Sequence, residues 1–282
     1  MSRIAAVFAR ANHTALIPYI TIGYPSVETT LKAVPLLASS GCDIIELGIP
    51  FSDPLADGAT IQRASYEALR QGVTPRVCFE VAQELRRQVE IPLVFMTYYN
   101  PVLKFGLEQF CSKCAELGID GLIIPDLPPE EGAELEKSTK RHGLDLVYLL
   151  SPASTEERIE LVGSRSSGFI YLVSLTGVTG ARAKLPEELE SFVARVREMT
   201  EKPLCVGFGV STPEQARRIA KVADGVIVGS RIIQLMEEDT TFSSLKAFAS
   251  SLREDLGHLN GRKKLGGEHA LAILNGVSPN MR

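Results

Sequence analysis

The 282-residue chain contains no tryptophan, only five cysteines, and no apolar run long enough to cross a bilayer. The formal net charge is -4, which argues against nucleic acid as the main partner. The first residues lack both a continuous apolar segment and a small-residue cleavage motif, so a secretory signal is not expected. These absences predict a soluble cytoplasmic protein.

A cysteine pair with metal-type spacing occurs once in the chain. Cys111 and Cys114 are separated by two residues, but no second pair of cysteine or histidine residues stands at zinc-ligand spacing. The same segment has a helical pattern, with Phe110, Cys114 and Leu117 on a common face. No metal site is therefore predicted. The other three cysteines stand among apolar residues, and we expect them to pack as small hydrophobes.

Short apolar runs alternate with helical patterns along most of the chain. The eight candidate strands are continuously apolar, which is typical of a parallel sheet buried on both faces. They cover residues 16–22, 44–47, 93–96, 121–124, 144–149, 169–173, 204–206 and 225–228. The helical patterns cover residues 28–39, 61–71, 75–88, 107–117, 130–142, 155–164, 186–200 and 213–222.

This succession predicts an α/β fold, a single (β/α)8 TIM barrel, because eight such units favour closure over an open doubly wound sheet. An amphipathic helix over residues 1–12, with Ile4, Val7 and Phe8 on one face, precedes the first strand. No linker interrupts residues 1–257, which we expect to form one barrel domain. Residues 258–282 contain four glycines and a basic cluster, and they are predicted to be a poorly ordered tail, with a docking segment as the alternative.

Two carboxylates stand out against the apolar pattern. Glu46 lies inside the short strand 44–47, and Asp57 follows in a loop with prolines and glycine. Burial of an unpaired carboxylate is costly and raises its pKa toward the range useful for proton transfer. Both residues would lie at the carboxyl ends of the barrel strands, where (β/α)8 enzymes have their active sites. The alternative is a structural carboxylate at Glu46 and a helix N-cap at Asp57.

Three glycine-rich turns, residues 176–180, 207–211 and 228–231, follow the last three candidate strands. Glycine allows a backbone N–H to approach an anion closely, and the N-terminus of the next helix adds partial positive charge. Because barrel enzymes often bind phosphate after strands seven and eight, we predict a phosphate site here. The candidates for the wall of an apolar pocket, each of which would otherwise be a core residue, are Tyr19, Met96, Leu122, Leu149, Tyr171 and Phe208.

Residues 46–58, with the sequence ELGIPFSDPLADG, closely resemble a signature of the tryptophan synthase alpha subunit family. Residues 98–101, 125–128, 177–180, 207–211 and 228–230 resemble further segments of that family. The resemblance implies a (β/α)8 barrel that cleaves indole-3-glycerol phosphate to indole and glyceraldehyde 3-phosphate. It also implies no cofactor in this chain and a beta-subunit partner that carries pyridoxal phosphate, with the two subunits forming an alpha2–beta2 heterotetramer.

Carried over residue by residue, the resemblance makes Glu46 the catalytic acid and base, and Asp57 the carboxylate that binds the indole N–H. It implies that the phosphate is held by Gly180, Gly209, Gly229 and Ser230. The residues implied to line the indole and glycerol pocket are Tyr19, Met96, Tyr171, Thr179 and Phe208. Asp53 and Pro54 would face the beta subunit. From the residues themselves, Glu46 in its apolar strand is suited to exchange protons, and Asp57 in its polar loop to remain charged.

Two other functions are alternatives. A stand-alone lyase that releases free indole is compatible with the same two carboxylates. A slow, phosphate-sensing module that mainly activates a partner enzyme would be marked by loss of Glu46 or Asp57, and both residues are present. Another phosphate-binding barrel, such as an isomerase of the same biosynthetic pathway, would share the fold, but residues 46–58 argue against it.

Overall fold

The computed structural model describes residues 1–10, 12–173, 187–207 and 209–257. Within these residues, nine strands pair in parallel and form one sheet. The strands are β1 (Ala15–Thr21), β2 (Ile45–Gly48), β3 (Leu93–Met96), β4 (Gly121–Ile123), β5 (Asp145–Val147), β6 (Leu149–Leu150), β7 (Ile170–Val173), β8 (Leu204–Gly207) and β9 (Gly225–Val228). Their order in the sheet is β5-β4-β3-β2-β1-β9-β8-β7-β6.

The order of the strands closes the sheet into the predicted barrel. β5 and β6 stand at the two ends of the order, yet only Tyr148 separates them in the chain. The single strand predicted over residues 144–149 is therefore two short strands, one paired with β4 and the other with β7. The break occurs where serine side chains replace backbone partners, since Leu146 N–H donates to Ser167 Oγ and Tyr148 N–H donates to Ser166 Oγ.

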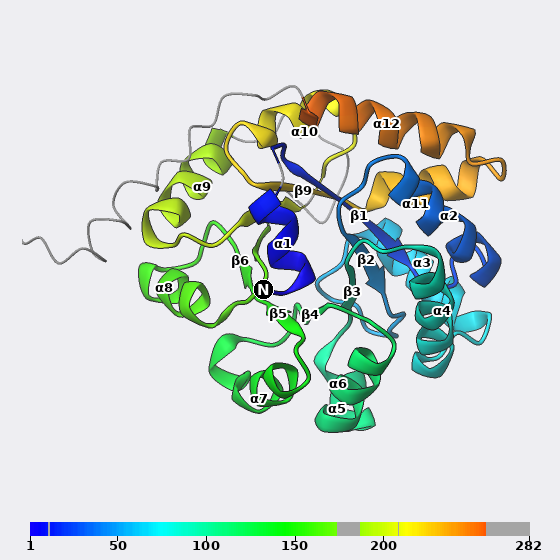
Figure 1. The fold of residues 1–282 in the computed structure, drawn as a ribbon, viewed down its shortest axis with the longest axis horizontal. Coiled ribbons are helices and arrows are strands. Elements are labelled where there is room, and N and C mark those ends of the chain that lie inside the picture. Colours follow the sequence, from blue (N-terminus) through cyan, green and yellow to red (C-terminus); the bar gives the residue numbers. More distant parts are fainter. Residues whose placement is uncertain (11, 174–186, 208, 258–282) are drawn as a thin grey trace, which may run out of the picture.

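The helices other than α1 form a ring outside the strands (Figure 1). The helices of the described residues are α1 (Arg3–Arg10), α2 (Val27–Ser39), α3 (Ala59–Arg70), α4 (Pro75–Gln88), α5 (Tyr99–Phe105), α6 (Leu107–Glu116), the 3-10 helix η1 (Pro129–Glu131), α7 (Ala133–Arg141), α8 (Glu156–Arg165), α9 (Glu187–Met199), α10 (Pro213–Ala220), α11 (Ser230–Glu238) and α12 (Ser243–Gly257). Helices α5, α11 and α12 are not among the helical patterns predicted from the sequence. None of the described helices is both long and apolar enough to span a membrane.

The predicted N-terminal helix is present as α1, which lies over the centre of the barrel in the view of Figure 1. Its Ile4 is fully buried and packs with apolar side chains of the barrel interior, among them Ile17, Val94 and Phe169. Val7 and Phe8 pack against the same cluster. The apolar face predicted for this helix therefore closes one end of the barrel, and leaves the other end for the functional site.

Three aspartates stabilise the amino-terminal ends of the strands by the same set of contacts. Each accepts a hydrogen bond from the first or second residue of a neighbouring strand and pairs with an arginine of an outer helix. The hydrogen bonds join Asp43 to Leu16 N–H at 2.8 Å, Asp120 to Leu93 N–H at 2.9 Å, and Asp224 to Leu204 N–H at 2.8 Å. The ion pairs join Asp43 to Arg253 of α12, Asp120 to Arg86 of α4, and Asp224 to Arg197 of α9. This end of the barrel is thus built for stability, as is usual for (β/α)8 folds.

Candidate active site

Glu46 points into the barrel because side chains alternate along β2. Ile44 belongs to the interior cluster, whereas Ile45 and Leu47 pack outward against the helices. The Glu46 side chain is fully buried, and neither carboxyl oxygen has a hydrogen-bond partner among the described residues. Burial raises the pKa of this carboxyl well above its usual value. A structural carboxylate would need a partner, so this arrangement favours a group that exchanges protons.

Asp57 lies in the loop between β2 and α3 and is also buried, with an exposed fraction of 7%. Gly58, not Asp57, is the N-cap residue of α3, so the N-cap interpretation is wrong. Burial raises the pKa of Asp57 to about 6, and a hydrogen bond from Tyr98 partly opposes this increase. At pH 7 a carboxyl with that pKa is ionised in about nine molecules of ten. Asp57 thus remains mostly charged, although its setting is less polar than the sequence suggested.

Tyr98 contacts Asp57 and is not among the site residues predicted from the sequence. It follows β3, and its hydroxyl donates to Asp57 Oδ2 at 3.0 Å while it accepts from Ala56 N–H at 3.0 Å. The only signal in the sequence is its place within residues 98–101, just beyond a strand at the working end of the barrel. Tyr98 and Asp57 are 41 positions apart, and no helical or strand periodicity relates residues at that separation.

Two tyrosines of the predicted pocket share one arrangement. Tyr19 on β1 is in register with Glu46 on β2, and its ring fills the space beside Gly48, where a Cβ would stand 2.1 Å from the tyrosine oxygen. Tyr171 on β7 lies in the same way against Gly207 on β8, with a corresponding distance of 2.3 Å. The charges of both Glu46 and Asp57 add to burial in raising the pKa of each tyrosine. The structure thus brings these four predicted residues together.

A cavity of about 560 Å³ opens beside this group. Met96 and Tyr171, both predicted for the pocket, line it together with Leu149 and with Ala56, the neighbour of Asp57. Leu122 instead packs in the core between strands and helices. The wall is mixed, because Ser151, Ser154, Thr155 and Arg158 line the cavity as well. Such a space suits a ligand with one apolar and one polar part.

The glycine-rich turns are described in part. Gly229 is the N-cap residue of α11 and Ser230 its first residue, and no side chain caps the N–H groups there. Ser230 and Gly209 are exposed, and Gly209 has a φ of +72°. Arg231 does not turn toward this N-terminus, since its Nη1 lies 3.2 Å from Glu238 Oε1. The predicted residues Thr179, Gly180 and Phe208 lie outside the described residues.

Comparison with known proteins identifies the family. Residues 6–257 match the family model described as "Tryptophan synthase alpha chain". The chain belongs to the tryptophan synthase alpha chain family. It is 57% identical over 256 residues to the tryptophan synthase alpha chain of Dehalococcoides mccartyi, covering 91% of this chain and 100% of the relative. The alpha chain of Geobacter sulfurreducens is 47% identical over 264 residues, covering 92% and 100%.

Solved structures agree with this assignment. Mycobacterium tuberculosis tryptophan synthase matches with a TM-score of 0.85 and 40% identity, covering 91% of this chain and 98% of that one. Tryptophan synthase subunit alpha from Legionella pneumophila matches with a TM-score of 0.84 and 36% identity, with the same coverage. The family resemblance seen in residues 46–58 is therefore confirmed, and it extends over nearly the whole barrel.

The loop that carries Asp57 also presents an exposed apolar side chain. Asp53 is exposed and Pro54 is half-buried, and the next residue, Leu55, has 89% of its surface exposed. Leu55 is the most exposed large apolar residue of the described chain after Met1. Asp53 and Pro54 are predicted site residues and Leu55 is not, although all three belong to the segment on which the family resemblance rests.

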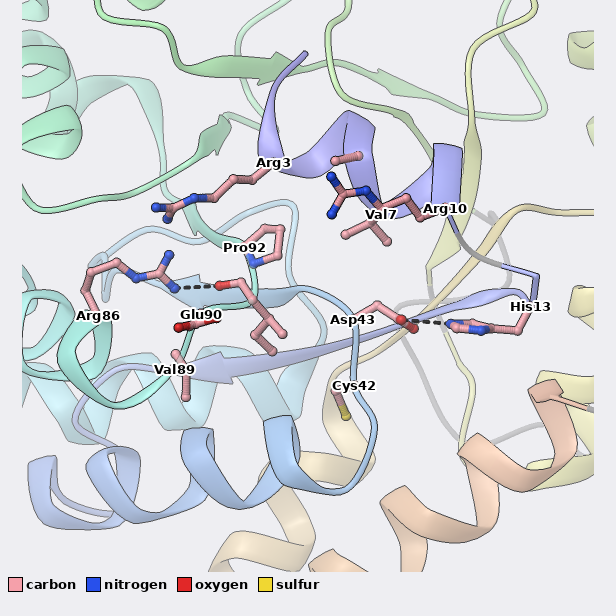
Figure 2. Close-up of a pocket in the computed structure, with 12 residues that line it drawn as sticks. Arg3, Val7, Arg10, His13, Cys42, Asp43, Arg86, Val89, Glu90 and Pro92 are labelled. Carbon is pink, nitrogen blue, oxygen red and sulfur yellow. Dashed lines mark hydrogen bonds and ion pairs between the residues drawn. The ribbon is translucent and has the colours of Figure 1, made fainter.

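A second cavity, of about 570 Å³, lies at the opposite end of the barrel from Gly48 and Asp57. Figure 2 shows it between α1, which carries Arg3 and Arg10, and the segment from Arg86 to Pro92. Its Asp43 already binds His13 at 2.8 Å and Arg253 at 2.9 Å. The carboxylate there serves the strand ends, so we do not assign the catalytic chemistry to this cavity.

The cysteines pack as the sequence predicts. All five are free and buried, and Cys111 and Cys114 lie on the inner face of α6 with Phe110. Among the described residues, no group of three histidine, cysteine, aspartate or glutamate side chains is placed to hold a metal ion.

Proposed function

We propose that the chain is the alpha subunit of tryptophan synthase, a carbon–carbon lyase of L-tryptophan biosynthesis. It cleaves indole-3-glycerol phosphate to indole and D-glyceraldehyde 3-phosphate. Its membership of the alpha chain family supports this activity. The observation that carries the assignment of the site is Glu46, a fully buried carboxyl without a hydrogen-bond partner among the described residues, at the end of the barrel where Asp57 also lies.

In this proposal Glu46 transfers both protons of the reaction. Because burial favours its neutral form, Glu46 starts as an acid and donates a proton to C3 of the indole ring. The resulting carboxylate then removes the proton from the side-chain hydroxyl next to C3. The C–O bond becomes a carbonyl, the bond from C3 to the side chain breaks, and its electrons restore the indole. Glu46 regains its proton and is ready for the next turnover.

Asp57 stabilises the charge that this sequence creates. Protonation at C3 places positive charge on the ring nitrogen, and an ionised carboxylate beside it lowers the energy of that intermediate. Asp57 suits this role because its pKa of about 6 leaves it mostly ionised at pH 7. We further propose that the Thr179 hydroxyl donates a second hydrogen bond to Asp57 when ligand is bound.

The remaining site residues bind the two ends of the substrate. We assign the indole and glycerol part to Tyr19, Met96, Tyr171, Thr179 and Phe208, and the phosphate to Gly180, Gly209, Gly229 and Ser230. The described members of the first set lie on β1, β3 and β7, around the two carboxylates. The open N-terminus of α11 supports the phosphate assignment, because uncapped N–H groups and the helix dipole attract an anion.

We propose that the partner is the tryptophan synthase beta subunit, in an alpha2–beta2 heterotetramer that holds pyridoxal phosphate in the beta subunit. Asp53 and Pro54 would contact it, and the exposed Leu55 supplies an apolar group for such an interface. The cleavage proposed above proceeds by proton transfer through Glu46, so it assigns no cofactor to this chain. Five free cysteines are compatible with the reducing cytoplasm, where we place the protein.

A steady-state assay on indole-3-glycerol phosphate, with and without a saturating beta subunit, tests the function. We expect slow cleavage by the chain alone and faster cleavage with the partner. Rapid release of free indole without any activation would instead identify a stand-alone lyase. Activation of the beta subunit without measurable cleavage would identify the phosphate-sensing module, and the assignment of Glu46 would then be wrong.

A further inference from the structure

We propose that Tyr98 is a positioning residue that fixes the orientation of the Asp57 carboxylate. It occupies Oδ2 and leaves Oδ1 as the acceptor for a donor on the substrate. This inference rests on the proposed function, in which that donor is the indole N–H. The Tyr98 hydroxyl makes Asp57 a hydrogen-bond acceptor with a fixed direction and not merely a nearby charge.

The direction of the hydrogen bonds follows from the chemistry of the three groups. The Tyr98 hydroxyl has one proton, a backbone N–H can only donate, and an ionised carboxylate can only accept. Since Ala56 N–H donates to Tyr98 Oη at 3.0 Å, the tyrosine proton is available for Asp57 Oδ2, also at 3.0 Å. The bond from Ala56 also polarises the hydroxyl and makes it a stronger donor to the carboxylate.

The Tyr98 ring is itself held in place. It stacks on Phe51 with ring centroids 5.1 Å apart and planes inclined by 26°. Phe51 is fixed in turn, because its backbone N–H and carbonyl both bond to the Ser65 hydroxyl of α3, at 2.8 Å and 2.9 Å. On the other side, Tyr99 N–H donates to Asp126 Oδ1 at 2.8 Å, which joins the loop after β3 to the loop after β4. Tyr98 therefore presents its hydroxyl from a rigid support.

The contact also affects the charge of Asp57. The hydrogen bond from Tyr98 lowers the pKa of Asp57 and so opposes the effect of burial. Two other titratable groups interact electrostatically with Asp57. They are Tyr19 on β1 and Tyr171 on β7, and both also interact electrostatically with Glu46 on β2. Burial raises the pKa of both tyrosines well above its usual value, so neither ionises near pH 7. Loss of the Tyr98 hydroxyl thus acts on Asp57 directly.

The test compares Tyr98→Phe with Tyr66→Phe in the full chain with a saturating beta subunit. Tyr66 is a matched control, because its ring on α3 is 60% exposed and the same substitution removes only a surface hydroxyl. For Tyr98→Phe we expect kcat on indole-3-glycerol phosphate to fall by about tenfold or more at pH 7, with a much smaller change in KM. The acid limb of the kcat profile moves to higher pH, and Tyr66→Phe changes neither value.

An independent readout separates this inference from the proposed function. In carbon-13 NMR of aspartate-labelled protein, the Asp57 resonance is assigned by its loss in Asp57→Asn, and its midpoint shifts upward in Tyr98→Phe. If the wild type cleaves no substrate, the proposed function fails while this titration still tests the contact. An unchanged midpoint, or a Tyr98→Phe variant that loses only unfolding free energy while it keeps kcat and the acid limb, would overturn the role of Tyr98.

Discussion

The ring of Tyr19 occupies the space that a side chain at Gly48 would need: a Cβ at position 48 would stand 2.1 Å from the tyrosine oxygen and 2.5 Å from Cζ. Glycine two residues beyond Glu46 is therefore a requirement of the site, not of a turn. Gly207 and Tyr171 show the same relationship, because the Tyr171 ring occupies the space that a side chain at position 207 would need. Both tyrosines can lie across the mouth of the barrel because the adjacent strand carries no side chain there.

We predict that Gly48→Ala lowers the free energy of unfolding by about 1–3 kcal/mol, the usual cost of overpacking a core. It should also impair cleavage, because Tyr19 must move away from Glu46. Chemical denaturation and the lyase assay measure the two effects. Gly257→Ala is the control, since no described atom lies within 4 Å of a Cβ there. If the contact is responsible, Tyr19→Ala combined with Gly48→Ala costs less than the sum of the single changes.

Glu46→Gln is expected to lower the rate of cleavage by about 10²–10⁴-fold, because it removes the titratable proton and keeps the size of the side chain. Affinity for glycerol 3-phosphate, measured by calorimetry, should change little. Glu90→Gln, an exposed position at the other end of the barrel, serves as the control. Retention of more than about a tenth of the wild-type rate would refute the role of Glu46.

Asp57→Asn is expected to change the pH dependence of stability. The pKa of Asp57 is about 6 in the folded chain and 3.8 in a model peptide, so between these values the folded state binds more protons and stability falls as pH rises. The difference corresponds to about 3 kcal/mol above pH 6. The variant should therefore gain stability relative to wild type as pH rises from 4 to 7, as measured by urea denaturation.

The exposed neighbour Asp53 provides the matched substitution, Asp53→Asn, for that comparison. A difference between Asp57→Asn and wild type that is the same at pH 4 and pH 7 would show that Asp57 does not carry the burial penalty described above. The lyase assay on the same variant checks that activity is lost even where stability is gained.

Gly209→Val and Gly229→Val are expected to weaken glycerol 3-phosphate binding by about tenfold or more, because a side chain displaces the anion from backbone N–H groups. At Gly229 a Cβ meets described atoms only at 3.5 Å or beyond, so Gly229→Ala fits the fold and tests the same point without strain. Dissociation constants are measured for variants with wild-type circular dichroism. Unchanged affinity in both valine variants would place the phosphate elsewhere.

Local patterns in the sequence determined the barrel and its principal acid. The bounds of β3 and β9 agree with prediction to the residue, since continuous apolar runs between turn residues mark buried parallel strands. Glu46 could be singled out because an acid inside such a run is costly without a task. These features depend on residues close together in the chain, so periodicity and composition record them.

Tertiary structure alone decided how the site is completed. Tyr98 reaches Asp57 across 41 positions, and Ser166 and Ser167 divide the strand predicted over residues 144–149. Likewise, Gly48 and Gly207 make room for tyrosines of other strands. Each of these contacts joins segments that the pairing of neighbouring strands brings together. No local pattern encodes them, because the distance between their partners along the chain is set by the intervening helices and loops.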